Sequence, residues 1–103
     1  SGEALFRHIQ ENPKIFRALL LDESLSFTLE PVWKMARQKS EALLNGLPET
    51  RIAIPIAANH IIASVFALMR WWLENDMPLP PEKMGEIFTD LIVQPTWLAM
   101  MKE

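Results

Sequence analysis

The chain has 103 residues, of which 50% are hydrophobic, with no cysteine and a formal net charge of -3. This length predicts one domain, the lack of cysteine excludes disulfides and thiolate metal sites, and the slightly acidic balance argues against a nucleic-acid-binding surface on this chain. A domain of this size buries only about two-thirds of its unfolded surface, so an apolar chain with 4 tryptophans is expected to leave apolar surface for a partner.

The first half of the chain predicts three helices separated by polar breaks, whereas strand signals are nearly absent. Residues 3–11 form the first helix, and Asn12-Pro13 opens the second as an N-cap followed by proline in the first helical position. The third helix begins near Thr28, because Pro31 is tolerated only in a first turn. It ends at Asn45-Gly46, two residues that tolerate left-handed backbone.

The second half predicts two longer helices that run antiparallel to each other. The fourth helix spans about Ile54 to Asn75, and the fifth about Pro81 to Ile92, with apolar residues at helical spacing along its length. Pro95 breaks the tail that follows. The predicted fold class is therefore all-α, with about five helices of which the last two form an antiparallel pair.

The fourth helix is apolar on two opposite faces, which is typical of a helix buried on both sides. A five-helix domain this small does not cover both faces itself. The simplest interpretation is a homodimer in which the last two helices of each copy form a four-helix bundle across a two-fold axis. Trp72 is then expected in the protomer's own core and Trp71 toward the partner, with ordinary core packing of both as the alternative. The predicted dimer interface comprises His60, Ala63, Ser64, Ala67, Trp71, Met84, Phe88 and Leu91.

The fourth helix is also long and apolar enough to span a bilayer. It holds Asn59 and His60 in its first third and Arg70 near its end, which favours a buried helix of a soluble protein. No secretory signal opens the chain, so a cytoplasmic location and no membrane partner are expected.

No catalytic motif is recognisable in the sequence. His60 has no carboxylate or cysteine close to it along the chain, and there is no HExxH motif and no P-loop. The paired glutamates and Glu-x-x-His motifs of di-metal bundles are missing as well. The chain is therefore predicted not to be an enzyme, and no catalytic residue, metal or cofactor is expected.

The segment "AANHIIASVFALMRWWLENDMPLPPEKMGEIFTDLI", with "ENPKIFRALL" upstream, resembles the C-terminal domain of TetR-family transcriptional regulators. In that family a "WLENGMPLSPEEM"-like corner joins the last two helices, and the resemblance runs from about residue 5 to residue 92. Two positions depart from the pattern. Asp76 stands where glycine is common, so Asn75 is expected to take the left-handed conformation, and Pro80 replaces the usual serine or threonine cap.

The resemblance implies that residues 3–103 are an effector-binding and dimerisation domain, without the N-terminal helix-turn-helix domain that reads operator DNA. It implies a pocket for a small hydrophobic ligand, which would shift the helices that carry the DNA-reading domains. The implied ligand-binding residues are Phe16, Leu20, Phe27, Trp33, Arg37, Asn59, Ile62, Phe66 and Met69. For each apolar residue, plain core packing is the competing interpretation.

Two other functions remain open at this point. One is a helical dimerisation module with no small-molecule ligand. The other is a stand-alone protein that sequesters a full-length regulator by forming heterodimers with it. Both share the predicted fold, so only the state of the pocket and the identity of the partner separate them from ligand sensing.

Overall fold

The computed structural model describes residues 1–101, and these residues form helices joined by short turns and loops, with no strand among them. The elements in chain order are α1 (Gly2–Glu11), α2 (Pro13–Leu21), the 3-10 segment η1 (Glu23–Leu29), α3 (Glu30–Leu44), α4 (Ile54–Glu74), α5 (Pro81–Ile87), the π-helical segment η2 (Phe88–Val93) and α6 (Gln94–Met101). The predicted all-α fold class is confirmed.

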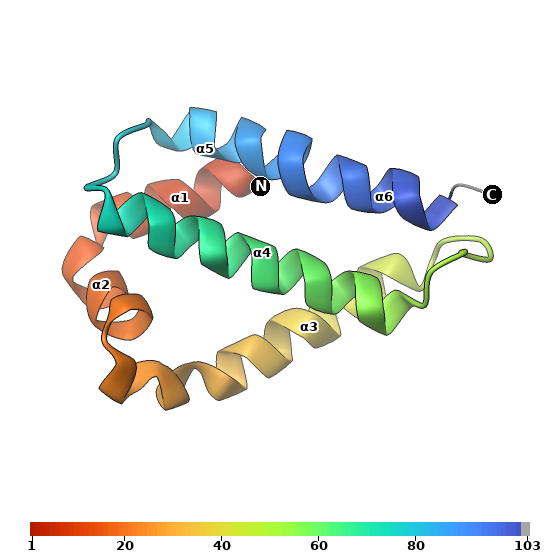
Figure 1. Cartoon of the computed structure of the whole chain (residues 1–103), viewed down its shortest axis with the longest axis horizontal. Coiled ribbons are helices and arrows are strands. Elements are labelled where there is room, and N and C mark those ends of the chain that lie inside the picture. The colour runs from red at the N-terminus through yellow and green to blue at the C-terminus, as the bar shows by residue number, and fades with distance from the viewer. Residues whose placement is uncertain (102–103) are drawn as a thin grey trace.

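Helix α4 lies at the centre of the molecule (Figure 1). The continuous rod of α5, η2 and α6 runs antiparallel to α4 on one side, and α3 lies against α4 on the other. Helix α1 packs along α5, and α2 closes the end near the turn between α4 and α5. Helix α4 begins at Ile54 as predicted and ends one residue before Asn75.

The core is built around Trp72, whose side chain has no exposed surface. Its ring meets Phe6 of α1 edge-on, with centroids 5.1 Å apart, and its Nε1–H donates a hydrogen bond of 2.9 Å to the carbonyl of Leu79. The prediction that Trp72 packs into the protomer's own core is confirmed. The other fully buried large side chains are Phe6, Ile9, Leu73, Met84 and Met100.

The turn after α4 differs from the expectation in one respect. Asn75 keeps a negative φ of -102°, whereas Asp76 and Met77 take the left-handed conformation with φ of 58° and 51°. The reason is a Schellman motif: the N–H of Met77 donates to the carbonyl of Trp72 at 2.7 Å, and the N–H of Asp76 donates to Leu73 at 3.1 Å. This motif requires left-handed backbone one residue later than the sequence suggested. Pro80 provides no side-chain cap for α5, as expected.

The prediction that Pro95 breaks the C-terminal tail is wrong, because the helix that starts at Pro81 continues to Met101. Proline inside a helix removes one hydrogen bond and crowds the carbonyl four residues earlier. Here the residues just before Pro95 adopt the wider π-helical turn of η2, which gives the ring room. The hydroxyl of Thr96 donates to the carbonyl of Ile92 at 2.7 Å. Lys102 and Glu103 of the predicted tail lie outside the described residues.

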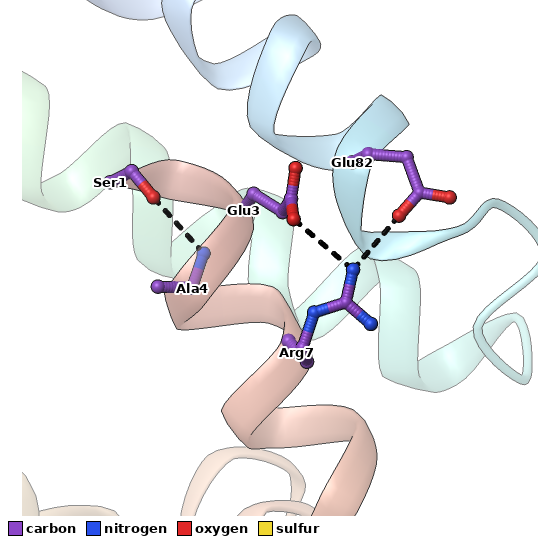
Figure 2. A network of polar contacts seen from close by, with 5 residues as sticks. All are labelled: Ser1, Glu3, Ala4, Arg7 and Glu82. Carbon is purple, nitrogen blue, oxygen red and sulfur yellow. Dashed lines mark hydrogen bonds and ion pairs between the residues drawn. The ribbon is translucent and has the colours of Figure 1, made fainter.

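Helices α1 and α5 approach so closely that only glycine fits between them. A Cβ on Gly85 would lie 2.6 Å from the main-chain nitrogen of Glu3, and a Cβ on Gly2 would lie 2.9 Å from a ring carbon of Phe88. Beside this contact the guanidinium of Arg7 bridges Glu3 of its own helix, at 3.2 Å, and Glu82 of α5, at 3.0 Å (Figure 2). The hydrogen bond that the guanidinium donates to Glu3 is the main reason that the pKa of Arg7 is raised.

Candidate ligand cavity and dimer face

An apolar cavity of about 390 Å³ lies between α2, α3 and α4. Five of the predicted ligand-binding residues come together in its wall. Every residue that lines the cavity is apolar, so it offers shape and hydrophobic contact but no side-chain hydrogen bond. The lining residues are Leu5, Phe16, Leu19, Leu20, Leu29, Val32, Ala36, Ile62, Val65, Phe66, Met69 and Phe88.

Trp33 and Arg37 form a second layer behind this wall. The Trp33 ring stacks on Phe66, with centroids 4.4 Å apart and planes 19° apart, and the guanidinium carbon of Arg37 lies 6.0 Å from the Trp33 ring centre. Their positions follow from helical spacing on α3, because residues four apart share a face. Neither side chain lines the cavity, but the stacked ring of Trp33 is placed to set the position of Phe66.

Phe27 and Asn59 lie away from the cavity, contrary to their expected place in the wall. Phe27 is 73% exposed on η1, where the tighter 3-10 turn carries it outward. Asn59 lies on an exposed face of α4, so its amide needs no buried partner. The cavity as built therefore has no polar side chain in its wall.

Sequence reasoning missed several wall residues, and two of them had a usable signal. Leu5 and Leu19 stand on the apolar stripes of the first two predicted helices, but a stripe does not show which members face a void. Phe88 was assigned to the dimer interface by its spacing. The structure instead turns its half-buried ring into the cavity and against Gly2, because Phe88 follows the buried Met84 by one helical turn and lies on the same inward face of the rod.

A second feature is a shallow hollow of about 400 Å³ between α4 and η2, which we call the α4–η2 hollow. It brings together five residues predicted for the dimer interface. Of its lining residues, Trp71 is 48% exposed and Leu91 is 67% exposed. The hollow is lined by His60, Ser64, Ala67, Leu68, Trp71, Leu91 and Ile92.

Three other residues predicted at the dimer interface lie elsewhere. Met84 is fully buried in the protomer's core because the close α1–α5 contact covers it, so it has no surface to offer a partner. Phe88 faces the cavity, as described above. Ala63 is exposed on α4 but does not line the hollow.

The apolar surface continues from the α4–η2 hollow toward the C-terminal end of α6. A neighbouring hollow of about 280 Å³ shares His60 with it and is walled by α4 and α6. Trp97, at 45%, and Leu98, at 66%, are also exposed on α6. Arg51 fixes this end of the rod, because its main-chain N–H donates to Met100 at 2.8 Å and its guanidinium donates to the carbonyl of Ala99 at 3.2 Å.

The described residues offer little for acid–base or metal chemistry. No group of three or more His, Cys, Asp or Glu side chains within residues 1–101 is placed to hold a metal ion. The pKa of Asp22 is lowered by hydrogen bonds from the hydroxyl and main-chain N–H of Ser24, and that carboxylate caps η1.

Helix α4 also passes a length-and-hydropathy test for a membrane span, with a mean hydropathy of 1.3 over its apolar window. A central helix of a water-soluble protein passes the same test. Only 33% of that window is buried inside the protomer. Most of this apolar helix therefore stays unburied there, in line with the expectation that the chain leaves apolar surface for a partner.

The family model described as the C-terminal region of a transcriptional regulator, of the TetR type, matches residues 2–94. This match covers every element from α1 to the end of η2. No curated protein and no solved structure gives a significant match.

Proposed function

The chain belongs to the family of TetR-type transcriptional regulator C-terminal regions, and on that premise we propose that it binds a small hydrophobic effector and pairs two copies of its parent regulator. It is a regulatory domain rather than an enzyme, and it works in the cytoplasm. In this proposal residues 3–103 form the sensing and dimerising part. Operator binding belongs to a helix-turn-helix domain of the parent protein.

The cavity beside α4 carries the proposal for ligand binding. A volume of about 390 Å³ with only apolar lining falls in the range of small-molecule pockets. Its walls offer no side-chain polar group to hold water in place, which favours an apolar guest. An uncharged, largely aromatic or aliphatic molecule is the class of effector that fits, and the flexible side chain of Met69 lets the wall adapt.

The exposed apolar face of α4, η2 and α6 supports the proposal for dimerisation. Trp71 and Leu91 on the α4–η2 hollow, and Leu98 on α6, are large apolar side chains left open to solvent in the protomer. Large exposed apolar side chains, where they gather on one surface, mark an association site in a soluble protein. Two such faces related by a two-fold axis give a four-helix bundle.

A dimerisation module without a ligand is the second candidate. It is favoured by the absence of any polar group from the cavity wall, since a ligand pocket ordinarily carries a few polar groups that orient its guest. In that case the cavity is only a packing defect of the protomer.

The two candidates are separated by a thermal unfolding series with toluene as the probe. A probe that binds only the folded state at ten times its Kd stabilises it by about 1.4 kcal/mol, which raises the Tm by roughly 6–11 °C for a domain of this size. Ala36→Phe places a ring in the cavity and is expected to remove this response. Ala42→Phe is the control, because Ala42 is exposed on the same helix, and it is expected to keep the response.

The result decides between the candidates in both directions. A rise in the Tm of the unmodified chain and of Ala42→Phe, absent in Ala36→Phe, supports a ligand cavity. If toluene leaves the Tm unchanged, or if Ala36→Phe responds as strongly as the control, the sensing proposal fails and the ligand-free module stands.

A further inference from the structure

The π-helical segment η2 contributes residues to both the cavity and the α4–η2 hollow. Its first residue, Phe88, lines the cavity, and two later residues, Leu91 and Ile92, line the hollow. A π-helical turn holds one residue more than an α-helical turn of the same length. Such turns are uncommon, poorly stabilised, and frequent at functional sites.

The rod is held firmly on both sides of η2. Upstream, Gly85 packs directly against the main chain of α1 at Glu3, so this part of the rod has no room to move toward that helix. Downstream, Arg51 binds the last carbonyls of α6. A disturbance that enters the rod between these two anchors is therefore confined to η2 and the turn that follows.

Phe88 is placed to transmit a displacement from the cavity to the main chain of η2. Its ring is in the cavity wall, and on another side it already touches the position of Gly2 closely enough to exclude a Cβ there. A guest that contacts this ring cannot displace it toward α1, because Gly2 of α1 already lies against it. The main chain of η2, whose π turn has an α-helical alternative, is the part that can yield.

We propose that η2 couples occupancy of the cavity to the shape of the α4–η2 hollow, by moving its extra residue along the rod and turning Leu91 relative to Trp71. The proposal rests on the cavity being the ligand site, as proposed above. The regulated element is η2, and the guest binds its two forms with different affinity. A ligand must do this to shift a conformational equilibrium.

The test uses the full chain labelled with 5-fluorotryptophan and followed by 19F NMR, with toluene as the guest. Trp33 reports on the cavity through its stacking on Phe66, and Trp71 reports on the α4–η2 hollow. The two resonances are assigned with Trp33→Phe and Trp71→Phe. Toluene is expected to shift both resonances in the unmodified chain.

Deleting Asp90 removes the extra residue of the π turn and restores α-helical spacing without changing the phase of α6. Asp90 is exposed, and Asp90→Ala is the control that keeps the residue count. The deletion variant is expected to keep the Trp33 shift and lose the Trp71 shift, while Asp90→Ala keeps both. Phe88→Leu, which retains the register but shortens the contact with the guest, is expected to behave like the deletion and serves where the deletion variant does not fold.

The possible results separate the two proposals. A Trp33 shift without a Trp71 shift in the unmodified chain overturns the coupling and leaves the ligand cavity in place. A Trp71 shift that persists in the deletion variant, or in Phe88→Leu, also overturns the coupling through η2. If toluene shifts neither resonance, the cavity is not a ligand site, and both proposals fall together.

Discussion

The indole Nε1–H of Trp72 donates a hydrogen bond of 2.9 Å to the main-chain carbonyl of Leu79. Trp72 lies in the last turn of α4, and Leu79 lies in the loop that leads to α5. One buried side chain therefore holds both ends of the turn that sets α4 antiparallel to the rod. The neighbouring Trp71 points outward, so adjacent tryptophans have opposite roles.

Trp72→Phe is expected to destabilise the fold by about 2–4 kcal/mol, because it leaves a cavity in the core and an unpaired carbonyl at Leu79. Trp71→Phe removes similar bulk from a position that is half-exposed in the protomer, so at concentrations that keep the chain monomeric it is expected to change the free energy of unfolding by less than about 0.5 kcal/mol. Urea unfolding followed by far-UV circular dichroism measures both. Equal midpoints for the two variants would contradict the different roles assigned to these residues.

Gly85→Ala is expected to destabilise the protein by about 1–3 kcal/mol, the usual cost of overpacking. The added Cβ would stand 2.6 Å from a main-chain nitrogen and 3.1 Å from the Cα of Glu3, so the relief requires α1 to move. Gly46→Ala is the matched control, since nothing lies within 4 Å of its Cβ position. That control is expected to be neutral or slightly stabilising. Thermal unfolding of the pair tests the contact, and similar losses in both variants would argue against it.

Asp76→Gly is expected to stabilise the protein by about 1 kcal/mol, because a non-glycine residue pays roughly that amount in the left-handed conformation, and Asp76 has a φ of 58°. The change also removes the ion pair with Arg17, at 3.0 Å, but this carboxylate is 91% exposed and such pairs contribute little.

Asp76→Asn separates the two contributions, since asparagine tolerates left-handed backbone and carries no charge. It is expected to leave the midpoint of chemical unfolding nearly unchanged. A loss of stability in both variants would show that the Arg17 contact outweighs the backbone strain.

The sequence was a good guide to the parts of the fold that local patterns determine. The start of α4 at Ile54, with Pro55 in its first turn, and the antiparallel corner that Trp72 anchors follow from apolar spacing and helix-breaking residues. Such rules did not predict that the last helix continues past Pro95. A proline at position 95 ordinarily ends a helix, and only the π-helical turn of η2 allows the rod to continue.

The candidate site was predictable in outline from the family resemblance. That resemblance implied α4 residues such as Ile62 and Phe66 in the cavity wall, and both lie there, on the face turned to α2 and α3. Spacing does not separate a wall from a packed core, and it does not report the outward turn of Phe27 on η1. Those features depend on how neighbouring elements meet.

Asp22 gives the fold a weak acid dependence. Hydrogen bonds from Ser24 lower its pKa below the ordinary aspartate value of 3.8, so its contribution to stability is present above that value and is lost as the pH falls through the lower folded pKa. Between pH 5 and pH 2 the unmodified chain is expected to lose more stability than Asp22→Asn, whose amide oxygen can still cap η1. Urea midpoints measured across this range test the sign, and parallel curves would contradict it.

Ala67→Trp is expected to break the proposed dimer. Ala67 is exposed in the protomer and lines the α4–η2 hollow, so the new ring leaves the protomer's core intact. On the proposed interface, however, the same ring fills the space in which the partner's helix would lie, and small residues are what allow helices to approach closely. Sedimentation equilibrium at several protein concentrations measures the change in dimer dissociation.

Ala42→Trp is the matched control, because Ala42 is an exposed alanine on α3, outside the apolar face of α4, η2 and α6. It is expected to remain as dimeric as the unmodified chain. If Ala67→Trp also stays dimeric with unchanged stability, the partner does not cover the α4–η2 hollow. The two copies would then have to meet elsewhere, and the exposed Phe27 and Val32 of η1 and α3 would be the next apolar surface to test.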